Sequence, residues 1–104
     1  MDDLEVTTTQ LGSAIVLHAI GAVDSDTAPR LQEPLLRAVD SSSGTVRLDL
    51  AQVPFMSSAG LRVLLLAAKA LQKRGQRLQL ANVPAHIHTV LNIAGFTSFI
   101  DVIA

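Results

Sequence analysis

Two adjacent serines precede the most regular amphipathic segment of the chain, and their hydroxyl groups are the first candidates for chemistry. Ser57 and Ser58 follow an extended segment and lead into apolar residues at helical spacing. A serine oxygen there can accept a hydrogen bond from an unpaired N–H of the first helical turn. The same hydroxyl can carry a phosphoryl group, because the start of a helix stabilises an anion. The residues alone leave both roles open.

Gly60 lies in the first turn of that predicted helix. Because it has no side chain, it would let a partner approach closely, or it could serve local packing only. A phosphate on a nearby serine adds about −1.5 to −2 charges. We expect that charge to change what docks on this end of the helix without unfolding it.

Other side chains that could support catalysis or hold a metal ion are poorly placed for it. Ser58 lacks the G-x-S-x-G elbow of a hydrolase, so we predict no enzyme activity. His86 and His88 are two residues apart on a predicted helix, whereas helical metal pairs are three or four apart. Asp24, Asp26 and Asp49 could be imagined as a cation site, but Asp26, or else Thr27, is the expected cap of the first helix and Asp49 ends a strand. We therefore predict neither a catalytic residue, nor a metal site, nor a cofactor.

The composition excludes several classes of protein. The chain has 104 residues, of which 49% are hydrophobic, and a formal net charge of −1, so one domain over residues 1–104 is expected. This charge and the absence of Trp and Tyr argue against nucleic acid as a partner. Without cysteine there is no disulfide or thiolate. The acidic start does not resemble a signal peptide, and the longest apolar stretch is too short to cross a membrane, so we expect a cytoplasmic protein.

Hydrophobic periodicity predicts alternating strands and helices. Alternating or continuous apolar runs predict strands at 4–10, 14–20, 45–50 and 77–82, and the tail at 96–103 could add a short one. Apolar residues at helical spacing predict a helix from Ala28, which Pro34 should kink or delay, another from Leu61 to Gly75, and a third ending at Gly95. This order predicts an α/β domain: a mixed sheet of about four to five strands with helices packed mainly on one face.

Three segments of the chain together resemble the STAS domain of bacterial anti-sigma factor antagonists. They are "GAVDSDTAPRL", "VRLDLAQVPFMSSAGLRVLL" and "LQLANVP…VLNIAGF", in the order and spacing of that family. The resemblance covers essentially the whole chain. It implies that a partner kinase phosphorylates the serine two places before the motif glycine, which is Ser58, with Ser57 as the second choice. Ser57 stands where the best-known antagonists carry Asp, and Ala59 replaces their second serine.

The resemblance also implies a partner switch. The unmodified domain would bind an anti-sigma factor that is also a serine kinase and so release a sigma factor to regulate transcription. Phosphorylation would weaken that complex, and a PP2C-type phosphatase would reverse the mark. Asp24 matches a family aspartate close to the modified serine, and Asp49 matches another. The implied partner-binding residues are Asp24, Ser57, Ser58, Ala59, Gly60 and Arg62.

Two alternatives remain open from the sequence. A STAS subunit of a lipid ABC transporter would contact an ATPase subunit through the same helix face without phosphorylation. A scaffold subunit of a stress-signalling complex would occur in a large assembly, whereas an antagonist would be a monomer or a dimer. No nucleic acid contact and no membrane insertion are expected for the antagonist.

Overall fold

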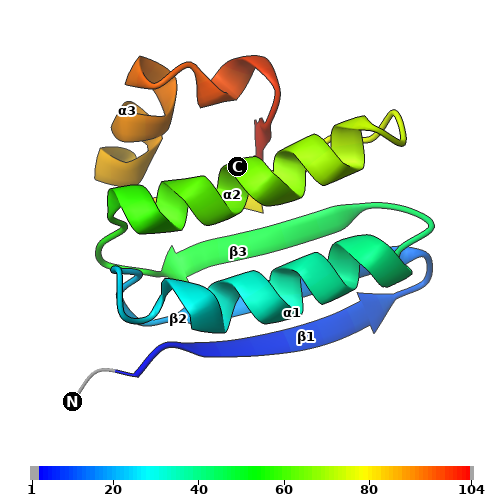
Figure 1. Ribbon diagram of the computed structural model, residues 1–104, viewed down its shortest axis with the longest axis horizontal. Helices are drawn as coiled ribbons and strands as arrows, with labels where there is room; N and C mark the ends of the chain where they lie inside the picture. Colours follow the sequence, from blue (N-terminus) through cyan, green and yellow to red (C-terminus); the bar gives the residue numbers. More distant parts are fainter. Residues whose placement is uncertain (1–2, 104) are drawn as a thin grey trace.

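The computed structural model of the protein describes residues 3–103, which form one mixed sheet and three α-helices (Figure 1). In chain order the elements are β1 Glu5–Leu11, β2 Ala14–Ile20, α1 Ala28–Ser41, β3 Val46–Gln52, α2 Ser58–Gln72, β4 Gln79–Ala81, α3 Ala85–Ile93, a 3₁₀ turn at Phe96–Ser98 and β5 Asp101–Ile103. The predicted α/β class is confirmed, and the tail adds a fifth strand.

The five strands lie side by side in sequence order, from β1 to β5. β1 and β2 are an antiparallel hairpin, and every later pair of neighbours is parallel. Each parallel connection carries a helix, because parallel neighbours need a long crossover. The carboxyl ends of β2 and β3, and the helix starts that follow them, therefore lie at one end of the molecule (Figure 1).

The helices cover one face of the sheet, as the alternating strand pattern predicts. Val46, Leu48 and Leu50 of β3 point into the hydrophobic core, whereas Arg47 and Asp49 point to the opposite face and are partly exposed. Figure 1 shows α1 and α2 side by side in front of the strands. In the part of the chain that the structure describes, no helix combines the length and the apolarity that a membrane span needs.

α1 begins at Ala28, the first residue of its apolar stripe, whereas α2 begins before its apolar stripe. α2 starts at Ser58, three positions before Leu61, because Ser57 caps it. Pro29 lies in the first turn of α1, where its missing N–H costs little. Pro34 lies within α1 but does not delay it, since the helix runs from Ala28 to Ser41.

Arg74 binds the C-terminal end of α1. The Arg74 guanidinium donates hydrogen bonds to the carbonyl oxygens of Val39 and Ser42. Terminal carbonyls of a helix lack partners within the helix, so Arg74 satisfies groups that would otherwise need water. This end of the molecule is opposite the two helix starts (Figure 1).

Candidate functional site

Two strand-to-helix junctions lie side by side at the end of the sheet where α1 and α2 begin. The first junction, residues 21–27, joins β2 to α1, and the second junction, residues 53–57, joins β3 to α2. Val23 N–H donates to the Phe55 carbonyl at 2.9 Å, and Ser57 N–H donates to the Val23 carbonyl at 2.8 Å. These bonds form an isolated parallel bridge between Val23 and Met56. The first junction therefore supports the segment that presents Ser57 and Ser58.

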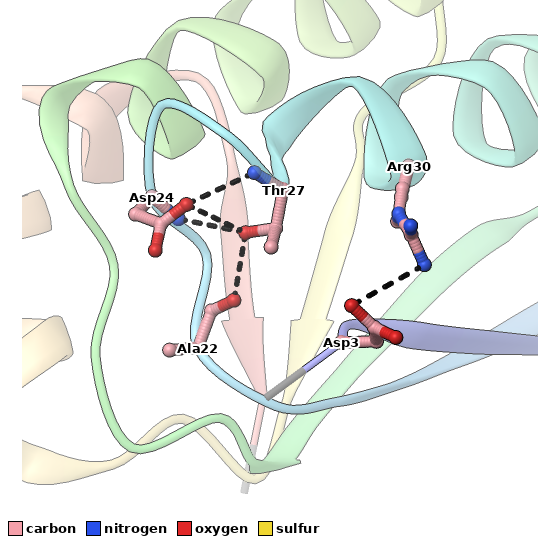
Figure 2. Close-up of polar contacts among 5 residues, drawn as sticks. All are labelled: Asp3, Ala22, Asp24, Thr27 and Arg30. Carbon is pink, nitrogen blue, oxygen red and sulfur yellow. Dashed lines mark hydrogen bonds and ion pairs between the residues drawn. The ribbon is translucent and has the colours of Figure 1, made fainter. Parts of the chain in front are cut away.

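Asp24 and Thr27 close the first junction with hydrogen bonds to each other (Figure 2). Asp24 Oδ1 accepts from the N–H groups of Asp26 and Thr27, both at 2.9 Å. Thr27 Oγ1 accepts from the Asp24 N–H at 2.9 Å and donates to the Ala22 carbonyl at 2.8 Å. Thr27 is buried, so these bonds fix the loop in a single shape.

Of the two predicted caps of α1, Thr27 occupies the N-cap position and Asp26 does not, while the carboxylate that binds the backbone amides at this end is that of Asp24. Asp26 lies within the turn before α1 and is exposed, whereas the Asp24 carboxylate faces the start of the helix (Figure 2). The Thr27 N–H holds the pKa of the Asp24 carboxyl below its ordinary value against a smaller opposing effect of burial, and the Asp26 N–H, the Thr27 hydroxyl and the Asp24 N–H lower this pKa further. Asp24 is thus an ionised group of the loop at neutral pH.

The second junction remains open to solvent. Ser57 is the N-cap of α2, and its Oγ accepts a hydrogen bond from the Ala59 N–H at 3.2 Å. Ser58 is the first residue of the helix and is exposed, while Ala59 is half-buried. The two roles considered for the serine pair are therefore divided: Ser57 makes the cap, and the Ser58 side chain faces solvent at the helix start.

Gly60 is buried where the two junctions meet. A Cβ added to it would lie 2.6 Å from Met56 Cγ and 2.8 Å from Val23 Cγ1, closer than packed atoms approach. Of the two roles that the sequence leaves open for Gly60, the structure supports local packing. The glycine lets α2 lie against the first junction, and it offers no surface to a partner.

The structure brings together most of the residues that the sequence singled out, but not all. Asp24 directly follows Val23, whose carbonyl accepts from the Ser57 N–H, and Arg62 is exposed one turn after Ser58. Asp49 lies instead on the uncovered face of the sheet. There its carboxylate contacts His18 Nδ1 at 3.3 Å and accepts from Asn82 Nδ2 at 3.1 Å.

Sequence reasoning missed the hydrogen bonds between Asp24 and Thr27 and the positions of two further residues at this site. The three-residue spacing of Asp24 and Thr27 is typical of local turns in which side chains bind backbone amides, and it was the available signal. Phe55 is half-exposed in the second junction, and His86 Nε2 of α3 lies 2.8 Å from the Pro54 carbonyl oxygen. No local pattern predicts the exposure of Phe55 or the His86 contact, because both depend on how distant parts of the chain pack.

The site has the geometry of a docking and modification surface. Across residues 3–103, no group of three or more His, Asp or Glu side chains is placed to hold a metal ion. Ser58 offers an exposed hydroxyl on a helix start, next to a loop that internal hydrogen bonds hold in place. A group added to the Ser58 hydroxyl would project into solvent, where another protein can contact it.

Comparison with known proteins points to one family. The family model described as "Mlab, STAS domain" matches residues 6–102. A curated relative, the putative anti-sigma factor antagonist BtrV of Bordetella bronchiseptica, is 34% identical over 99 residues, which cover 95% of this chain and 85% of the relative.

Solved structures share the fold at lower identity. The crystal structure of an anti-sigma factor antagonist from Mycobacterium paratuberculosis superposes with a TM-score of 0.86 at 20% identity, covering 96% of this chain and 85% of that one. The Bacillus cell fate determinant SpoIIAA in its phosphorylated form superposes with a TM-score of 0.75 at 16% identity, covering 96% of this chain and 92% of that one.

Proposed function

Because this chain belongs to the STAS domain family, we propose that it is an anti-sigma factor antagonist whose binding is controlled at Ser58. Unmodified, it binds an anti-sigma factor that is also a serine kinase, and the sigma factor held by that kinase is released. Residues 1–104 act in this role as one cytoplasmic domain, without a catalytic site of their own. The name of the Bordetella relative supports the antagonist function.

The observation that carries the proposal is the exposed position of Ser58 at the start of α2. Ser57 occupies the capping position, so Ser58 Oγ is not needed by the fold. Asp24 and Thr27 hold the neighbouring loop, which keeps this helix start in place when a partner docks. The partner-binding surface consists of Ser58 with its exposed or half-exposed neighbours, while Gly60 supports it from below. Those neighbours are Asp24, Ser57, Ala59 and Arg62.

The modification is a phosphoryl transfer from ATP. The Ser58 hydroxyl oxygen forms a bond to the γ-phosphorus, the bond from that phosphorus to the ADP oxygen breaks, and the hydroxyl proton passes to a base of the kinase or to solvent. A PP2C-type phosphatase reverses the step by attack of water, which restores the serine and releases inorganic phosphate. The antagonist is substrate in both reactions.

The energy that such a switch needs is small. Each ~1.4 kcal/mol lost at an interface weakens binding tenfold. A phosphate brings about −1.5 to −2 charges, and burying an unpaired charge costs several kcal/mol. One phosphate at the centre of the contact is therefore sufficient to release the partner.

The test is capture of partners from a lysate of the source organism, using four forms of the protein as bait. They are the wild type, Ser58→Ala, Ser58→Asp and the control Ser43→Asp, which adds the same charge at an exposed serine in the loop between α1 and β3. We expect an ATP-binding serine kinase on the wild type, Ser58→Ala and Ser43→Asp. Ser58→Asp should bind it at least about tenfold more weakly.

Other outcomes of that capture contradict the proposal. Equal binding of the kinase by Ser58→Ala and Ser58→Asp would exclude a charge switch at Ser58. Recovery of a transporter ATPase by all four baits would favour a lipid-transport subunit. Recovery of a large stress-signalling assembly would favour a scaffold subunit.

A further inference from the structure

Arg62 lies one helical turn after Ser58 on the outward face of α2. Both residues are exposed, and they are separated by four positions, so their side chains share one face of the helix. The β-carbons of such a pair are about 5–6 Å apart. The Cα–Cβ bonds of a helix tilt toward its N-terminus, so the Arg62 side chain leaves the helix on the side of Ser58 and is long enough to reach it.

The Arg62 guanidinium has no carboxylate partner in the part of the chain that the structure describes. The ion pairs found over residues 3–103 involve other basic side chains, those of His18, Arg30, Arg37 and Arg77. The first turn of α2 contains no acidic residue either. The Arg62 guanidinium is therefore a cation without a countercharge, one helical turn from the proposed modification site.

A phosphate on Ser58 would supply that countercharge. An acidic group at the first position and a basic group four residues later is the favoured order for a helical ion pair. Arginine suits a phosphate better than lysine does, because its planar guanidinium can donate two parallel hydrogen bonds. The phosphate would also meet the free N–H groups of the first turn.

We propose that Arg62 is the intramolecular partner of phosphorylated Ser58. In the unmodified protein Arg62 is free to pair with an acidic group of the docked partner. In the phosphorylated protein the same guanidinium is held by the phosphate. Modification thus acts twice, since it adds negative charge to the surface and withdraws a positive charge from it. This regulation rests on the proposed function at Ser58.

The test is independent of any partner protein. Phosphoserine is incorporated at position 58 by genetic encoding, and the second ionisation of the phosphate is followed by ³¹P NMR as the pH is varied. The parent protein with Arg62 is compared with the variants Arg62→Lys and Arg62→Gln. The control is Arg37→Gln on α1, which removes an exposed arginine that pairs with Glu33 at the same four-residue spacing.

We expect the titration midpoint of the protein with Arg62 to lie roughly 0.3 pH unit below that of Arg62→Gln, because the cation favours the dianion. Arg62→Lys should fall between them, Arg37→Gln should match the parent protein, and added salt should reduce the difference. Asp24 and His86 belong to segments that flank the start of α2. Both are present in every variant, so their effects cancel in the comparison.

Coincident titrations of the parent protein and Arg62→Gln would overturn the proposal. An equal shift in Arg37→Gln would do so as well, because it would show a general charge effect. Failure of the kinase capture at Ser58→Asp, with the Arg62 shift intact, would contradict the proposed function but leave the ion pair standing. The two conclusions are therefore tested separately.

Discussion

The first and second junctions contain similar residue types, but internal hydrogen bonds close the first junction and leave the second open. Each joins a strand to a helix, and each contains short polar residues of the capping type. In the first junction, Asp24 and Thr27 bind each other and the neighbouring backbone amides and carbonyls. In the second junction, the Ser57 side chain accepts from a single backbone amide. The side chain of Ser58, which follows at the start of α2, is exposed.

The first junction therefore acts as a support, and the second junction, with Ser58 beside it, acts as an exposed surface. The closed junction holds a fixed carbonyl, that of Val23, to which the open junction is bonded through Ser57 N–H. Gly60 permits the close contact between the two. The open junction can therefore change its charge without loss of the fold, because its own stability depends little on the Ser58 hydroxyl. Substitutions should affect folding at the first junction more than at the second.

The largest expected effect is that of Thr27→Val. The substitution keeps the shape of a buried side chain but removes the hydroxyl that binds the Asp24 N–H and the Ala22 carbonyl. Leaving these groups without a partner should lower the free energy of unfolding by about 1–3 kcal/mol, measured by urea denaturation. Thr27→Ser keeps the hydroxyl and should recover much of the loss. Equal stability of Thr27→Val and the wild type would mean that the junction is not closed by this side chain.

A smaller loss is expected for Ser57→Ala at the open junction. The substitution removes one cap hydrogen bond to the Ala59 N–H and should cost about 1 kcal/mol in the same denaturation experiment. Ser57→Asp supplies another oxygen acceptor at the N-cap and should stay close to the wild type. If Ser57→Ala lowered the free energy of unfolding more than Thr27→Val does, the second junction and not the first would be the support.

The smallest effect is expected for Asp24→Asn, and it should depend on pH. Asparagine keeps an oxygen that can accept the same hydrogen bonds, so only the charge changes. The pKa of Asp24 is lowered in the folded protein, chiefly by the Thr27 N–H. Its ionised form therefore stabilises the fold fully above the unfolded-state pKa of about 3.9, and this stabilisation is lost as the pH falls through the lower folded-state value.

The measurement is urea denaturation of the wild type and Asp24→Asn between pH 7 and pH 3. The wild type should be the more stable at neutral pH, and the difference should shrink in acid. Asp26→Asn is the control, because the Asp26 side chain accepts no hydrogen bond from any residue that the structure describes. A pH-dependent difference of the same size at Asp26 would contradict the role assigned to Asp24.

Much of the fold was predictable because it depends on local periodicity. The stretch from Ala14 to Ile20 forms the predicted strand, and the alternation of Val46, Leu48 and Leu50 gave both a strand and its buried face. The start of α2 was placed too late, since its first turn carries capping residues instead of apolar ones. At the site, Asp26 and Thr27 were the predicted caps and Thr27 is the N-cap, but Asp24 makes the bonds to the backbone amides, because several acceptors compete within one short loop.

By itself the sequence determined the order of strands and helices, the single buried face of the sheet and the position of the two serines at a helix start. These features depend on residues that are neighbours along the chain. Only the tertiary structure decided that Ser57 caps while Ser58 is exposed, and that the glycine at 60 serves packing. Both depend on the bridge between Val23 and Met56, which forms when the sheet aligns two distant segments.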